Sequence, residues 1–256
     1  MIGFTWPLRI TMASRIYLKM EVNMIKGSIG ILAGMGPRST TPFLELVLDQ
    51  CQVQYGAKYD IDYPHIIVYS LPTPFYIDRE IDHSLMKRTI IDGLKKLEST
   101  GVSFIAMPCN SAHLYFDELK NSIKAPLLNI VEETVSCLPN SKQRTTIFAT
   151  EITVKSELYQ KGIISAGHEF IFMEQWQTKV NNIINAIKMK RDREFINSLW
   201  NELICEVKDQ CVDSVIIACT DLSILSNVAE LKLNIYDSSE ALAKSVVKKY
   251  LKSRQE

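Results

Sequence analysis

The 256-residue sequence lacks a net charge and is poor in the residues that interrupt regular structure. Lys and Arg together number 29, as do Asp and Glu, so there is no general basic field of the kind that concentrates a protein on nucleic acid or on an anionic membrane. Only nine Pro and ten Gly are present, against 46% hydrophobic residues, which excludes a disordered or fibrous chain. The balance indicates a folded globular protein whose partner is a small molecule, with no nucleic acid.

Paired metal-binding motifs are also missing. The six cysteines include no C-x-x-C pair, and His65, His83 and His168 have no companions at metal-ligand spacing. The chain is too long to depend on a disulfide framework. We therefore expect no metal site, reduced thiols and a cytoplasmic location.

The first 24 residues contain no apolar run long enough to span a bilayer and no evident cleavable signal. They include Arg9, Arg15 and Lys19, and Met24 lies directly before the first convincing strand. We expect residues 1–24 to be an extension outside the fold, and no membrane association.

From Ser28 onward, short β-branched apolar runs alternate with longer amphipathic stretches. This alternation is typical of βαβ units, so the predicted fold class is α/β with mostly parallel sheets flanked by helices. The expected strands are 28–33, 66–70, 102–107, 127–129, 145–149, 169–173, 215–218 and 234–236. The expected helices are 41–51, 84–99, 111–122, 131–138, 154–161, 179–188, 192–209 and 238–252.

Two segments of the sequence repeat one pattern. Cys109 follows Val102 by seven residues, and Cys219 follows Val212 at the same distance, each directly past a buried strand. A looser repeat pairs the strand that ends in Ala33-Gly34-Met35 with the strand that ends in Ala149-Thr150. Together the two repeats favour a duplicated chain with two related halves.

Cys109 and Cys219 are the candidate reactive groups. Ligands of open α/β sheets bind outside the carboxyl ends of the strands, and helix N-termini there stabilise both thiolates and carboxylates. Asn110-Ser111 and Thr220-Asp221 follow the two cysteines and provide groups that cap a helix or bind an oxygen-rich ligand. The alternative is that each cysteine is an ordinary buried apolar residue. That alternative is favoured only for Cys51, Cys137, Cys205 and Cys211, which lie on predicted helices or at their ends.

The Gly-rich turn after the first strand is not a nucleotide fingerprint. Ser39 occupies the place of the third glycine of G-x-G-x-x-G, and no Walker lysine follows. A tight turn whose backbone approaches a small anion accounts for the glycines. In the second half Thr150 and Thr153 either bind a ligand or cap a helix. His113 and Asp221 either orient or deprotonate the neighbouring thiol, or act as caps.

Five motifs, in order and at the expected spacing, resemble the aspartate/glutamate racemase family from about Ile25 to the C-terminus. They are Gly34-Met-Gly-Pro37, Met107-Pro-Cys-Asn-Ser-Ala-His113, Ala149-Thr-Glu-Ile-Thr-Val-Lys-Ser-Glu-Leu-Tyr159, Ala218-Cys-Thr-Asp-Leu222 and Asp237-Ser-Ser-Glu240. The resemblance implies two pseudo-symmetric lobes with the active site between them, and a homodimer. The lobes would comprise residues 25–131 plus 235–256, and residues 132–234. It also implies that the last helix crosses back to pack on the first lobe.

Carried over by position, the resemblance makes Cys109 and Cys219 the two catalytic acid/bases of a racemase without a cofactor. The implied substrate-binding residues are Met35, Arg79, Asn110, Ser111, Thr150, Thr153, Lys188 and Thr220. Arg79 matches the family's arginine only if Phe75-Tyr76 is an insertion. Ile152 replaces the usual glycine and Asp221 the usual glutamate, and these departures bear on the substrate more than on the reaction.

The implied reaction is interconversion of L- and D-amino acids, with aspartate and glutamate as the expected substrates. One thiolate would remove the α-proton while the opposite thiol delivers another, so the site must lower a thiol pKa from its ordinary value of about 8.5. Alternatives on the same scaffold are a broad-specificity amino-acid racemase, a hydantoin racemase, a maleate-type isomerase or a decarboxylase. An inert amino-acid-binding protein is a further alternative, although binding alone needs neither thiol.

Overall fold

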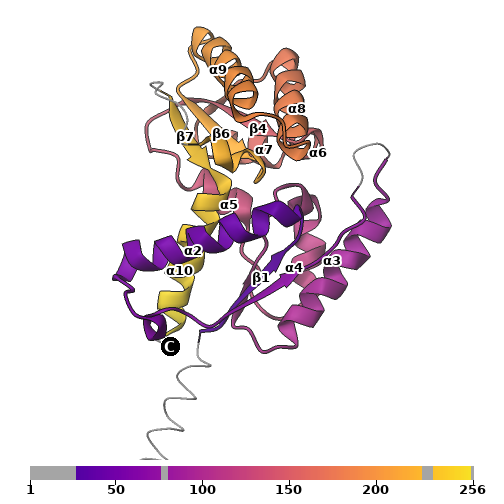
Figure 1. Cartoon of the computed structure of the whole chain (residues 1–256), viewed down its shortest axis with the longest axis vertical. Coiled ribbons are helices and arrows are strands. Elements are labelled where there is room, and N and C mark those ends of the chain that lie inside the picture. Colours follow the sequence, from indigo (N-terminus) through magenta and orange to yellow (C-terminus); the bar gives the residue numbers. More distant parts are fainter. Residues whose placement is uncertain (1–26, 76–79, 227–232, 255–256) are drawn as a thin grey trace, which may run out of the picture.

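The computed structural model describes residues 27–75, 80–226 and 233–254 as two parallel sheets flanked by helices (Figure 1). The strands are β1 (Ile29–Ala33), β2 (Ile66–Ser70), β3 (Phe104–Ala106), β4 (Arg144–Ala149), β5 (Glu169–Phe170), β6 (Ser214–Ala218) and β7 (Asn234–Asp237). The α-helices are α2 (Thr40–Tyr55), α3 (His83–Glu98), α4 (Phe116–Asn121), α5 (Ile130–Val135), α6 (Glu151–Lys155), α7 (Leu158–Ser165), α8 (Glu174–Lys188), α9 (Arg193–Asp209) and α10 (Ser238–Ser253). Short 3₁₀ helices are η1 (Pro37–Ser39), η2 (Asp60–Asp62), η3 (Ser111–Tyr115) and η4 (Leu222–Leu225).

The two sheets repeat one topology. The first has the order β2-β1-β3 and the second the order β5-β4-β6-β7, with every pair parallel. The position of β7 beside β6 is matched in the first sheet by a single parallel bridge between Ile105 and Leu127. The predicted α/β class with two pseudo-symmetric halves is confirmed.

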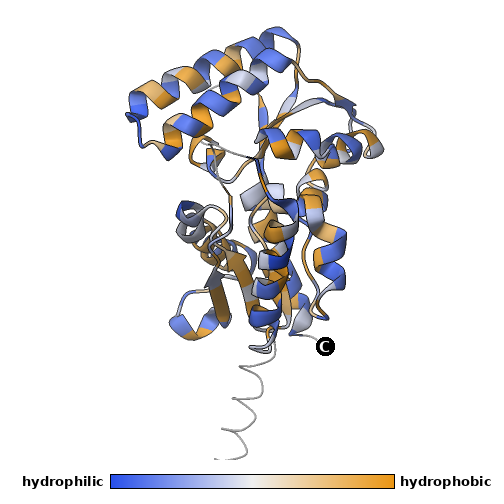
Figure 2. Ribbon diagram, turned by 90° about the vertical axis from the view of Figure 1, so that its right-hand side faces the viewer, coloured by the Kyte–Doolittle hydropathy of each residue, from blue (hydrophilic) through white to orange (hydrophobic). Residues whose placement is uncertain are grey.

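The apolar core is partly shared between the halves. Figure 2 shows hydrophobic residues along the helices and strands of both halves. One buried cluster joins Ile31 of β1 to Ile147 of β4, Ile216 of β6 and Val246 of α10. Two further clusters each lie within one half. Strands of both sheets therefore contribute to one buried cluster, together with helices of both halves.

Helix α10 runs from the second sheet back to the first half and packs on α2 and α5 (Figure 1). It begins at Asp237, whose carboxylate accepts hydrogen bonds from the N–H groups of Ser239 and Glu240. The expected return of the last helix is confirmed. Strand β7, however, pairs with β6, so residues 235–237 belong to the second sheet rather than to the first lobe. The rest of the proposed lobe division stays a prediction.

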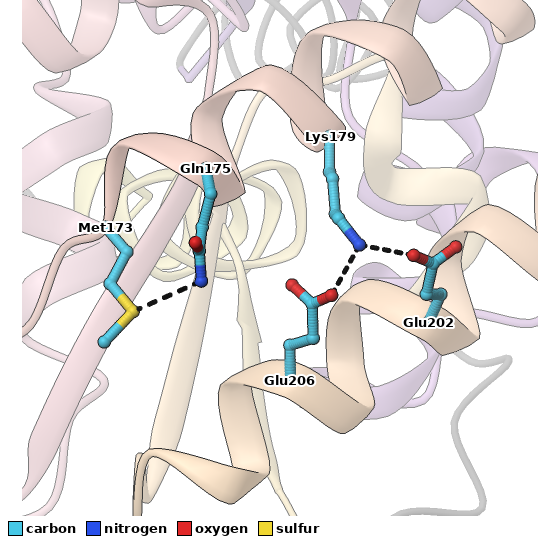
Figure 3. A network of polar contacts seen from close by, with 5 residues as sticks. All are labelled: Met173, Gln175, Lys179, Glu202 and Glu206. Atoms are coloured by element: carbon cyan, nitrogen blue, oxygen red, sulfur yellow. Dashed lines mark hydrogen bonds and ion pairs between the residues drawn. The ribbon is translucent and has the colours of Figure 1, made fainter.

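Helix α8 is held against α9 by polar contacts at its exposed edge (Figure 3). The ammonium of Lys179 contacts the carboxylates of Glu202 and Glu206, the latter at 2.5 Å. These carboxylates raise the pKa of Lys179. Near the start of α8, Gln175 donates a hydrogen bond to the sulfur of Met173 at 3.8 Å. The packing of α8 matters for function because Lys188 is its last residue.

Several predicted elements differ from the structure. The expected helix 111–122 is the 3₁₀ helix η3 followed by the short helix α4. The expected strand 127–129 is reduced to one bridge, because Asn129 already caps α5 with its side chain. The expected helix 154–161 is two helices, α6 and α7, separated by Glu157 in the left-handed region at φ 57°. The expected strand 169–173 contains only two residues. For residues 127–129 and 154–161, a local cap or turn overrides the apolar pattern.

The expected extension, residues 1–24, lies outside the described residues. Within the described part of the chain, no helix combines the length and the apolar character needed to cross a bilayer.

Candidate active site

A cavity of about 490 Å³ lies at the carboxyl ends of the strands and is lined by residues of both halves. Loops after β1, β3, β4 and β6 contribute to it. Eight of the predicted site residues line it: Met35, Cys109, Asn110, Ser111, Thr150, Lys188, Cys219 and Thr220. Thr153 lies immediately behind this lining, and Arg79 lies outside the described residues.

Cys109 lies past β3 and packs against the apolar cluster of the first half. The backbone N–H groups of Ser111 and Ala112 point at its sulfur and favour the thiolate. Burial acts in the opposite direction and is the larger effect, raising the pKa of the Cys109 thiol to about 11. The helical turn alone therefore does not produce a thiolate at neutral pH.

Cys219 holds the equivalent position in the second half. It lies past β6 within the apolar cluster of that half, and the N–H groups of Asp221 and Leu222 favour its thiolate. Burial, followed by the nearby Asp221 carboxylate, raises the pKa of the Cys219 thiol to about 12. Lys188 opposes this increase at both sulfurs. Both groups are thus neutral thiols at pH 7 in this structure.

A cluster of three hydroxyls joins the halves beside Cys109. The Ser111 hydroxyl lies 2.9 Å from that of Thr150 and 3.1 Å from that of Thr153, and the two threonine hydroxyls are 3.0 Å apart. Thr150 also caps α6 by accepting from the N–H of Thr153. Capping and presentation to the cavity, the two alternatives from the sequence, therefore occur together. Thr153 is buried and supports the other two hydroxyls.

Asn110 connects three distant segments of the fold. Its amide donates to the hydroxyl of Ser238 at 2.9 Å, and its carbonyl accepts from the hydroxyl of Tyr159 at 2.6 Å. All three side chains are buried. Sequence reasoning missed the roles of Tyr159 and Ser238, although both stand in the motifs that carried the resemblance.

Asp221 and Lys188 form the charged part of the wall. Lys188 Nζ lies 3.6 Å from Asp221 Oδ2 and 5.1 Å from the centre of the Phe75 ring. Ser39, from the turn after β1, donates to Asp221 Oδ1 at 3.1 Å. Asp221 therefore does not act alone on its neighbouring thiol, because it already binds a hydroxyl from the other half and an ammonium.

Gly34 shows why the first turn needs glycine. Its φ is +93°, and a Cβ there would lie 2.5 Å from the backbone nitrogen of Leu71. The Gly34 N–H donates to the Thr40 hydroxyl at 3.2 Å. The close approach predicted at this turn is to protein backbone rather than to an anion.

His113 is turned away from the thiol. Its Nε2 accepts from the Ile130 N–H at 3.2 Å, which leaves Nδ1–H to donate to the Cys109 carbonyl at 2.8 Å. Burial lowers the pKa of His113 to about 4. His113 therefore does not deprotonate the Cys109 thiol. It is a positioning group that joins the Cys109 turn to α5.

An apolar wall of the cavity was not identified from the sequence. Phe75, Ile81, Met86, Ile90 and Tyr115 line it. Met86 and Ile90 are four residues apart on α3, a spacing that reads as ordinary core. No group of three or more potential metal ligands occurs among the residues that the structure describes.

Comparison with known proteins places the chain among racemases. A sequence model described as Asp/Glu/Hydantoin racemase matches residues 32–246, which is well over half of the chain. The broad specificity amino-acid racemase RacX of Bacillus subtilis is 49% identical over 223 residues, which cover 87% of this chain and 98% of the relative.

Two solved structures share the fold. The aspartate racemase of Picrophilus torridus has a TM-score of 0.74 and 26% identity, covering 87% of this chain and 94% of its own. The glutamate racemase of Francisella tularensis, solved with D-glutamate, has a TM-score of 0.61 over 90% of this chain and 83% of its own. At 18% identity, the second likeness shows the fold alone.

Proposed function

This chain belongs to the Asp/Glu/hydantoin racemase family and is an amino-acid racemase, hence an isomerase, and we propose that Cys109 and Cys219 carry its chemistry. The observation that supports this assignment is that the two thiols come from equivalent turns of the two halves and line one cavity. Inversion at Cα needs proton removal on one face and delivery on the other, so groups from opposed walls suit it.

The proposed cycle uses one thiolate and one thiol. The thiolate of one cysteine takes the α-proton and becomes a thiol, while the electron pair remains on Cα. The thiol of the other cysteine then protonates the opposite face and becomes a thiolate. The negative charge has thereby moved from one sulfur to the other, and the reverse reaction starts from the second arrangement.

Burial opposes formation of the first thiolate, since it raises the pKa of both thiols. Three groups lower the thiol pKa and so oppose the effect of burial. They are the N–H groups beside each sulfur, the Lys188 ammonium and, once bound, the ammonium of the substrate. Because both sulfurs are buried, where the local dielectric constant is low, a bound cation acts strongly on a nearby sulfur. We therefore propose that substrate binding generates the thiolate that begins the reaction.

The carbanion also needs stabilisation, for which we propose no pyridoxal cofactor. The N–H groups of the turns after the two cysteines and the hydroxyls of Ser111, Thr150 and Thr220 would bind the substrate carboxylate. Donors that are already in place stabilise developing negative charge without the cost of reorganisation. Met35 and Asn110 complete the proposed binding wall, and Thr153 supports it. Arg79 as a binding residue stays a prediction. The expectation of aspartate and glutamate as substrates came from the resemblance, whereas a relative that is 49% identical is named a broad specificity amino-acid racemase.

The decisive experiment is proton NMR in D₂O with a panel of L- and D-amino acids and no added cofactor. We expect the α-proton signal to disappear with the native protein. Cys109→Ala and Cys219→Ala should each reduce turnover at least about a thousandfold. Cys205→Ala is the matched control, because Cys205 is exposed on α9 and far from the cavity lining. Undiminished turnover in either active-site variant, or no exchange with any amino acid, would contradict the proposal.

We further propose a cytoplasmic homodimer. None of the six cysteines forms a disulfide, and the two proposed reactive thiols must stay reduced to function. Light scattering after size-exclusion chromatography should give about twice the mass of one chain.

A further inference from the structure

The part of the cavity that faces α3 is apolar. Met86 and Ile90 are 7% and 0% exposed, and they line the cavity together with Ile81. Tyr115 adds its ring, while its hydroxyl is already paired with Nδ1 of His83 at 2.6 Å. This surface thus offers methylene, methyl and ring contacts with little capacity for hydrogen bonding.

The described cations of the cavity are poorly placed to receive an acidic side chain. Lys188 is paired with Asp221 and lies over the ring of Phe75. A carboxylate that approached Lys188 would also approach the Asp221 carboxylate and be repelled by it. Arg38 also lines the cavity but is exposed, where water screens its charge. The local charge balance therefore gives little reason to select an acidic substrate.

We propose that the substrates are α-amino acids with non-acidic side chains, whose aliphatic stems lie on Ile81, Met86 and Ile90. This inference rests on the proposed racemase function and adds the substrate class. A stem in an apolar pocket gains or loses roughly tenfold or more in kcat/KM per methylene group. Among the described residues, a carboxylate in the same place must lose water without gaining a cation of its own.

Three amino acids of similar length test the substrate class. Glutamate and glutamine differ in charge but hardly in shape, and methionine has an apolar side chain of the same length. We expect kcat/KM for methionine and glutamine to exceed that for glutamate at least about tenfold. A preference for glutamate or aspartate would overturn this inference and leave the racemase function intact. No exchange with any amino acid would overturn both.

Variants of α3 test the location of the subsite. Met86→Ala should reduce kcat/KM for methionine about tenfold more than that for alanine, because alanine does not reach α3. Alanine turnover also shows that the variant is folded. Leu85→Ala is the control, since Leu85 is the neighbouring residue but is 41% exposed and does not line the cavity. Equal losses for methionine and alanine, or an equal loss in the control, would place the side-chain subsite elsewhere.

Discussion

The two halves of the molecule share a topology but differ in the residues around each cysteine. The second residue after each cysteine reaches across to the turn after the first strand of the other half. Ser111 contacts Thr150 in one case, and Asp221 accepts from Ser39 in the other. The contact of Ser111 with Thr150 is thus between neutral groups, whereas the contact of Asp221 with Ser39 includes a carboxylate. The shared topology gives the two thiols equivalent backbone positions, and the side chains then make them unequal.

The two thiols differ in pKa. Asp221 is the second-largest influence on the Cys219 pKa and a smaller one on the Cys109 pKa. Burial is the largest influence on both thiols, and the pKa is about 11 for Cys109 and about 12 for Cys219. We therefore expect Cys109 to lose its proton more easily in the empty site.

The turn after the first strand of each half gives the largest expected effect. Gly34 and Thr150 hold equivalent places, directly after β1 and β4. Gly34→Thr should lower the free energy of unfolding by at least about 3 kcal/mol, because a side chain would collide with the Leu71 backbone at a positive φ. Thr150→Gly should cost less than about 1 kcal/mol, since glycine is a tolerated cap. Urea unfolding measures both, and equal losses would show that the turns are interchangeable.

The fourth residue after each cysteine also differs between the halves, as His113 in the first and Ser223 in the second. Burial lowers the pKa of His113 from 6.5 to about 4, so the folded protein opposes its protonation. Its contribution to stability is complete above pH 6.5 and is lost as the pH falls toward 4. The free energy of unfolding should fall by about 2 kcal/mol between pH 7 and pH 5 from this residue alone.

His113→Gln provides the comparison, because glutamine retains polar atoms but does not titrate. Urea unfolding at pH 7 and pH 5 should show a smaller loss in this variant than in the native protein. The same loss in both would mean that other groups control acid stability.

Removal of the Asp221 carboxylate should bring the pKa values of the two thiols closer together. Asp221→Asn should lower the pKa of both, and that of Cys219 more, because a nearby anion that opposes ionisation is lost. The rate of alkylation by iodoacetamide at pH 8 should rise, about tenfold for each unit of pKa. Asp209→Asn, at an exposed site on α9, is the control. Unchanged alkylation in Asp221→Asn would show that its carboxylate does not reach the sulfurs.

Much of the fold could be predicted because buried parallel strands are continuous β-branched runs, and because the two cysteine segments repeat the same spacing. The placement of Cys109 and Cys219 at one cavity followed from that repeat. Contacts between distant residues could not be predicted in this way. Ser39 and Asp221 are separated by 182 positions, and no local pattern marks them as partners.

The electrostatic character of the site was also hidden in the sequence. Helix termini suggested lowered thiol pKa values, whereas burial raises both, and the depth of burial depends on the packing of the whole fold. The apolar wall on α3 was hidden for a related reason. Met86 and Ile90 have the spacing of core residues, and only the fold shows that they also face a cavity.

The return of α10 to the first half sets an order for synthesis. Its residues Leu242, Ala243, Val246 and Val247 are fully buried in the core shared by both halves. They are translated only after the whole second half. At about 5–20 residues per second, α10 is synthesised on the order of ten seconds after the first half. During that interval we expect the apolar faces of α2 and α5 to be exposed on the nascent chain. A chaperone could bind to these faces.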